Sequence, residues 1–208
     1  MYWKMKEFDI AYEKAELVLK EMNYDTNEMI PTSAIMDTVE KILGIDVKFT
    51  DYDFKKFNKK DKSSVKFEKF GAAMCVEKKD DEITATILLN ERETPAMKRF
   101  SLVHELGHLI TQDKLVVDEN CGYQVSTHIN MDITSIPNKI VKKHSVLIDE
   151  QIANIFALLV LIPMDMLLSA LKEHDSLEGV ARFFGVEKNA LISRILLKDF
   201  KRNMVDAE

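Results

Sequence analysis

The stretch from Phe100 to Ile110 is largely apolar, yet it holds the pattern His-Glu-x-x-His at residues 104–108. On an α-helix, residues four apart lie on one face with their Cβ atoms about 6 Å apart. His104 and His108 could therefore bind a single ion. The apolar residues around them favour a buried pair of ligands over a solvated face, and these are Leu102, Val103, Leu106, Leu109 and Ile110. The stretch is thus predicted to be a helix that carries a metal site.

The start of this helix is marked by Thr94 and Pro95, a typical N-cap followed by proline in the first turn. No further Pro or Gly occurs until Gly107, so the motif lies well inside a helix of about four turns. A glycine inside a helix costs about 1 kcal/mol relative to alanine. Gly107 is therefore expected to mark a place where another backbone or a substrate comes close.

Zinc is the metal that this pattern favours. Two neutral imidazoles at about 2.0–2.1 Å from the ion leave room for a carboxylate and a water in a tetrahedral site. Glu105 follows the first histidine directly and can lean toward that water. The predicted chemistry is hydrolysis of a peptide bond, with one zinc ion per chain.

A catalytic zinc site usually takes three protein ligands, so a third is expected elsewhere in the chain. The metzincin continuation is absent, because Thr111 and Lys114 stand where that pattern needs Gly and His. The downstream candidates are Asp113, Asp118, His128, His144, Asp149 and Glu150. Glu150 is favoured because it opens an apolar helical stretch that would pack beside the first helix. Asp149 would face about 100° away, and we expect it to be a helix N-cap.

Two signatures together resemble the ImmA/IrrE family of metallopeptidases. The first is RFSLVHELGH at residues 99–108. The second is ExxANxFA at residues 150–157, which closes at Ile162 and Pro163. The resemblance spans most of the chain, from the N-terminal helical segment to the C-terminal helices.

This resemblance implies both a site and a partner. The zinc ligands that it implies are His104, His108 and Glu150, and the residue that activates water is Glu105. Members of the family cleave or inactivate helix-turn-helix repressors of prophages, integrative elements or stress regulons. A protein substrate of this kind is therefore expected.

Length and composition agree with a compact protein of one domain. A chain of 208 residues with 46% hydrophobic content can bury one sizeable core. A single domain over residues 1–208 is expected, with a C-terminal helical pair at about 176–200 as part of it.

Cys75 and Cys121 are too few for a disulfide framework and are expected to be free thiols. The N-terminus has no apolar h-region and the longest apolar run, residues 155–162, is too short to span a membrane, so a cytoplasmic location is predicted.

The net charge of −6 argues against bulk affinity for nucleic acid or for an anionic membrane. One local exception is a basic cluster made up of Lys55, Lys56, Lys59, Lys60 and Lys62. We interpret this cluster as a solvated loop that protects the edge of a sheet from further pairing.

Apolar periodicity divides the chain into helices and strands. Apolar residues recur at helical spacing from Phe8 to Met22, and a second helix is expected from about Thr32 to Leu43, ending at Gly44. Extended stretches follow at Ile45–Phe49, Val65–Val76 and Ile83–Asn90. The remainder is predicted to be mostly helical. The expected fold class is α+β, with a small twisted β-sheet packed against a mostly helical bundle that carries the zinc site.

Two features of the sequence bear on where a substrate would bind. The connection from Asp113 to Ser145 is longer than most loops, and we expect it to form a wall or lid of the cleft. Three residues of this connection are candidates for polarising the scissile carbonyl or binding its oxyanion, namely Tyr123, His128 and His144. The strand Ile83–Asn90 either offers an edge to an extended substrate or is internal and fully paired.

A different class of function is indicated by residues 177–194. They have the small residue, the turn glycine and the later apolar residue of a helix-turn-helix. Direct binding of nucleic acid is nevertheless disfavoured, because the second helix offers mainly Lys188, Asn189 and Arg194 and the chain is acidic. Two further hypotheses are a zinc-containing regulator or anti-repressor that binds its repressor or DNA without proteolysis, and a component of a toxin–antitoxin pair.

Overall fold

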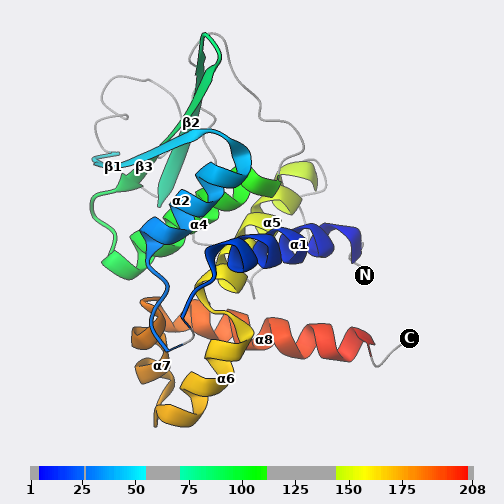
Figure 1. Cartoon of the computed structure of the whole chain (residues 1–208). Helices are drawn as coiled ribbons and strands as arrows, with labels where there is room; N and C mark the ends of the chain where they lie inside the picture. Colours follow the sequence, from blue (N-terminus) through cyan, green and yellow to red (C-terminus); the bar gives the residue numbers. More distant parts are fainter. Residues whose placement is uncertain (1–4, 26, 55–70, 112–143, 206–208) are drawn as a thin grey trace.

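The computed structural model describes residues 5–25, 27–54, 71–111 and 144–205. In these residues the elements are α1 (Met5–Met22), α2 (Thr32–Leu43), β1 (Asp46–Tyr52), β2 (Ala72–Lys79), β3 (Glu82–Asn90), α4 (Pro95–Thr111), α5 (His144–Leu161), α6 (Met164–Glu173), α7 (Leu177–Phe184) and α8 (Lys188–Val205). The fold is α+β, as predicted, with a small sheet at one end of a mostly helical molecule (Figure 1).

The sheet has the strand order β1-β3-β2, so that β3 lies in the centre. β1 pairs with β3 in parallel, and β2 pairs with it in antiparallel orientation. The predicted extended stretch Ile83–Asn90 forms β3, in which the buried Ala85, Ile87 and Leu89 alternate with less buried residues. Because both edges of β3 are already paired, the hypothesis that a substrate adds to this strand is wrong, and the prediction of an internal, paired strand is correct.

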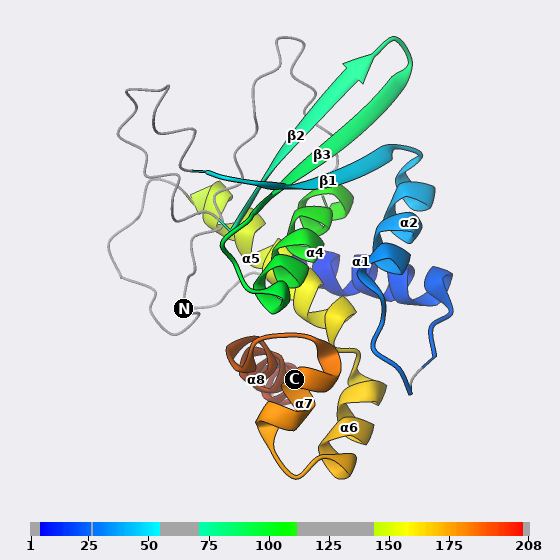
Figure 2. The same ribbon diagram turned by 90° about the vertical axis from the view of Figure 1, so that its left-hand side faces the viewer.

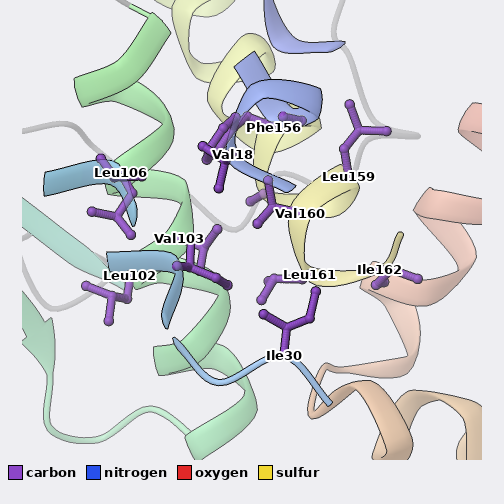
Figure 3. Packing of buried hydrophobic residues seen from close by; sticks show 14 of the residues in the cluster. Val18, Ile30, Leu102, Val103, Leu106, Phe156, Leu159, Val160, Leu161 and Ile162 are labelled. Atoms are coloured by element: carbon purple, nitrogen blue, oxygen red, sulfur yellow. The ribbon is translucent and has the colours of Figure 1, made fainter. Parts of the chain in front are cut away.

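The core lies between the sheet and three long helices. α4 packs between the sheet and α5, α1 lies along α5, and α2 covers another side of α4 (Figures 1 and 2). Figure 3 shows part of this core, in which apolar side chains of α1, α4 and α5 pack together. Several of them are fully buried, including Val18, Val103, Leu106, Phe156 and Val160. Burial of these apolar surfaces fixes α4 and α5 side by side, which positions the candidate site.

Local capping explains where two of the helices begin or end. The hydroxyl oxygen of Thr94 accepts a hydrogen bond from the backbone N–H of Met97 at 3.1 Å, which confirms the predicted N-cap of α4. α2 ends at Gly44, whose φ of 65° is the left-handed conformation of a C-cap. The backbone N–H of Gly44 donates to the carbonyl of Glu40 at 2.8 Å, so this predicted boundary is also confirmed.

α5 begins earlier than the sequence pattern indicated. It starts at His144, more than a full turn before Glu150, so Asp149 lies inside the helix and its prediction as an N-cap is wrong. The sequence pattern missed these residues because 144–149 mix polar and apolar side chains, which gives a weak helical signal.

The C-terminal helices form a separate layer below α4 and α5 (Figure 2). α7 and α8 are joined by a tight turn in which Gly185 has a φ of 62°. Arg99, near the start of α4, ties this layer to the rest: it donates to the carbonyls of Phe184 at 3.2 Å and Ile30 at 2.6 Å and to the hydroxyl of Thr32 at 2.6 Å. Burial lowers the pKa of Arg99 to about 10.

No helix within the described ranges has the length and apolar character to cross a membrane by itself. Residues 148–161 of α5 and the following α6 meet both criteria only when taken together, and they are bent by 56° relative to each other.

Candidate metal centre

Three side chains from two helices converge between α4 and α5. His104 and His108 come from α4 and Glu150 comes from α5, and one potential ligand atom of each lies within 4.8 Å of the other two. The Nε2 atoms of the two histidines are 3.0 Å apart. The Glu150 carboxylate places Oε2 at 3.4 Å from Nε2 of His104 and Oε1 at 3.3 Å from Nε2 of His108. The spacing argument for the two histidines and the preference for Glu150 over Asp149 thus agree with the observed geometry.

The position of Glu150 is set by close packing of the two helices. A Cβ atom added to Gly107 would lie 3.1 Å from both the Cα and the carbonyl oxygen of Ala153, and 3.0 Å from a ring carbon of Phe156. The expectation that Gly107 marks a close approach of another backbone is therefore confirmed. Small residues on both helices let the backbones come near enough for a carboxylate on α5 to reach imidazoles on α4.

Electrostatics keep Glu150 ionised. Burial alone would raise the pKa of this carboxyl group, but hydrogen bonds from His104 and His108 outweigh it and lower the pKa to about 2. An ionised carboxylate is the form that a metal ion requires.

The two histidines differ in their proton affinity. Burial lowers the pKa of His104, and the interactions with Glu150 and Asn154 offset this only in part. Burial also acts to lower the pKa of His108, but the hydrogen bond to Glu150 and the negative charges of Glu105, Glu150 and Asp149 outweigh it, so the pKa of His108 is raised.

Asn154 is a residue of this centre that the sequence argument did not single out. Its Oδ1 atom lies 3.0 Å from Nδ1 of His104. With the proton on Nδ1 donated to this amide oxygen, Nε2 keeps its lone pair and faces His108 and Glu150. The available signal was spacing, since Asn154 lies four residues after Glu150 and therefore on the same face of α5.

Glu105 is fully buried in α4. It directly follows His104 and precedes His108 by three residues on the same helix, and its negative charge contributes to the raised pKa of His108. The structure thus places Glu105 beside the centre, while the atoms that converge as potential ligands belong to His104, His108 and Glu150.

Of the other predicted site residues, Asp149 is exposed and is not among the converging ligands. His144 is the first residue of α5, and its side chain lies outside the described part of the structure. The remaining candidates lie outside the described residues: Asp113, Asp118, Tyr123 and His128, together with Cys121 and the lysine cluster at residues 55–62. Cys75 is buried in β2, and its thiol donates to a carboxylate oxygen of Glu77 at 3.8 Å.

Comparison with known protein families identifies the fold around this centre. Residues 41–196 match the model of the peptidase M78 family, described as an IrrE N-terminal-like domain. The chain belongs to this family. The match confirms the resemblance to ImmA/IrrE proteins, and it covers α4, α5 and the C-terminal helical pair up to residue 196. No curated protein matches the chain.

The donor set of this M78 family member fits a metal ion. Two imidazole nitrogens and one carboxylate oxygen converge in a largely buried position, and the charge of the carboxylate compensates part of the charge of a cation. His104, His108 and Glu150 are therefore the residues that could hold a metal in this peptidase.

Proposed function

We propose that this protein is a zinc-dependent metallopeptidase that cleaves or inactivates a helix-turn-helix transcriptional repressor of a prophage, mobile element or stress regulon. The observation that carries the proposal is the convergence of His104, His108 and Glu150 between α4 and α5. The membership in a peptidase family supports peptide-bond hydrolysis as the reaction.

In this proposal, His104, His108 and Glu150 hold one zinc ion. A histidine pair with one glutamate is a donor set that catalytic zinc sites use, with a fourth position left for water or substrate. Zinc bound there would polarise the scissile carbonyl and lower the pKa of a bound water to near 7. Asn154 would keep His104 in the tautomer that presents Nε2.

Glu105 is proposed as the general base. It follows His104 in sequence and is buried next to the ligands. Its carboxylate would accept a proton from the attacking water and then deliver this proton to the nitrogen of the leaving amine. The same group therefore serves both halves of the reaction.

The repressor as substrate rests on the kinship with IrrE-like proteins. Such a repressor binds DNA in the cytoplasm, so the proposal includes a cytoplasmic location. α7 and α8 are proposed to be part of the peptidase fold and not a DNA reader. Glu187, just before α8, accepts a hydrogen bond from Thr94 at 2.8 Å, and Arg194 is buried and donates to the carbonyl of Ile162 at 3.0 Å. Both side chains are thus engaged in contacts within the protein, whereas a recognition helix needs its side chains free to contact the edges of DNA bases.

A time course tests the proposal. The zinc-loaded protein is incubated with the helix-turn-helix repressor encoded beside its own gene, and the products are followed by mass spectrometry and by DNA binding of the repressor. We expect discrete fragments and loss of DNA binding at the same rate. Loss of DNA binding with an intact repressor would instead show sequestration, and no change in either would reject the repressor as a partner.

A further inference from the structure

Ser101 is a buried residue of α4 that the proposed mechanism does not use. Its side chain is fully buried, and among the described residues its hydroxyl oxygen has no hydrogen-bond partner. Other hydroxyls in helices of this protein bond back to their own helix: Thr111 donates to the carbonyl of Gly107 and Thr38 to that of Ala34, both at 2.7 Å. Ser101 does not follow this common pattern, so its donor is available to another group.

The position of Ser101 on the helix points to that group. Each residue turns an α-helix by about 100°, so Ser101 lies between His104 and Glu105 around the axis, one turn closer to the N-terminus. Residues four apart are neighbours on the helix surface, which places Ser101 next to Glu105. The hydroxyl therefore shares the face that carries both a proposed ligand and the proposed base.

The contacts in the described part of the chain give no reason for a hydroxyl at this position. A buried polar atom without a partner destabilises the folded state, and alanine is a better helix former than serine. Alanine would also leave nearly the same packing. The hydroxyl is thus expected to contribute to a state other than the resting fold.

We propose that Ser101 is a positioning residue for Glu105: after a small rotation of its side chain, its hydroxyl donates a hydrogen bond to the Glu105 carboxylate and orients it toward the attacking water. The inference rests on the proposed function, because it assigns Ser101 a role through the proposed base. A hydrogen bond to an ionised carboxylate is short and strong, so it would restrict the carboxylate to one orientation in this buried site.

Three variants separate the effect of the hydroxyl group from the effect of side-chain volume. Ser101→Ala removes the oxygen, while Ser101→Thr and Ser101→Val add matched volume and differ only in keeping or lacking a hydroxyl. Activity is measured on a pool of internally quenched peptides with random central residues. We expect Ser101→Ala and Ser101→Val to lower kcat about tenfold or more with KM nearly unchanged, and Ser101→Thr to retain most of kcat.

Stability and metal content show whether the effect is merely structural. We expect Ser101→Ala to bind zinc as tightly as the wild type and to unfold at the same or a higher temperature, because it removes an unpaired buried hydroxyl. The proposal would be overturned if kcat is unchanged in Ser101→Ala. It would also be overturned if kcat is as low in Ser101→Thr as in Ser101→Val.

A crystal structure of the zinc-loaded wild type provides a readout that does not depend on turnover. Ser101 Oγ is expected at about 2.5–3.0 Å from a carboxylate oxygen of Glu105. If the wild type cuts neither these peptides nor the repressor, the proposed peptidase function fails, and this distance still decides the role of Ser101. A hydroxyl beyond hydrogen-bond reach of Glu105 in that structure would reject it.

Discussion

Glu105 and its two neighbouring histidines share one turn of α4, yet the proposed mechanism gives them different tasks. Because Glu105 acts on water and not on the metal, Glu105→Gln should keep the fold and near-stoichiometric zinc. Loss of the base should lower the rate by about 100-fold or more. Metal analysis together with a cleavage assay checks this prediction, and a variant that is purified without zinc would contradict the division of roles.

Glu150 and Asp149 provide a matched pair of adjacent carboxylates, one converging on the histidines and one exposed. Glu150→Gln replaces an anionic ligand with a poorer neutral donor. It should weaken zinc binding by more than about 100-fold, which exceeds the loss expected for a residue that only orients a ligand. Asp149→Asn should change zinc binding little. Chelator competition measures both variants, and the reverse ranking would move the ligand to Asp149.

Asn154 is predicted to act through His104. Asn154→Ala removes the acceptor for the Nδ1 proton, so zinc affinity should fall about 10- to 100-fold while the helix stays intact. Asn154→Asp keeps an acceptor oxygen and should retain tight binding. Equal losses in both variants would show that Asn154 matters for packing and not for the orientation of the imidazole.

The two ligand-bearing helices approach each other closely at Gly107, and this contact is predicted to control both stability and the metal centre. Gly107→Ala would place a Cβ atom at 3.1 Å from the backbone of Ala153, which cannot move without shifting α5. Overpacking of this kind costs about 1–3 kcal/mol, which exceeds the roughly 1 kcal/mol that alanine gains in helix propensity. Denaturant unfolding should show a net loss of stability, accompanied by weaker zinc binding.

Gly179 in α7 is the control for this prediction. A Cβ atom there would meet the nearest side-chain atoms at 3.4 Å, an ordinary contact. Gly179→Ala should therefore be neutral or slightly stabilising. If Gly107→Ala behaved in the same way, the close approach of the helices would not limit the site.

The elements that the sequence predicted well are those with strong local signals. Thr94 and Gly44 define helix ends through caps, and the spacing of His104 and His108 defines one face of a helix. The sequence left open whether β3 is an edge or a central strand, because strand order depends on pairing between distant segments, including a parallel partner in β1. Asn154 was missed because a neutral amide carries no ligand signal of its own, and its role appears only when α5 lies against α4.

At the scale of the whole molecule, the burial of the proposed site indicates that the protein is selective among protein substrates. The proposed base and the histidine ligands are buried within the core between the sheet and α5, in a chain with a net charge of −6. A scissile segment must therefore be flexible enough to be drawn in as an extended chain. Folded parts of the partner would have to dock on the outside, which adds discrimination beyond the scissile segment itself.

We therefore expect the protein to cut the repressor encoded beside its gene much faster than casein, a generic unfolded substrate, at equal concentrations. Unfolded chains supply the extended segment but lack the folded surface that would hold it at the site. Initial rates from gel densitometry measure the difference, and Glu105→Gln serves as the control because it should abolish cleavage of both substrates. If casein and the repressor are degraded at the same Glu105-dependent rate, the protein is a general protease and its proposed regulatory role fails.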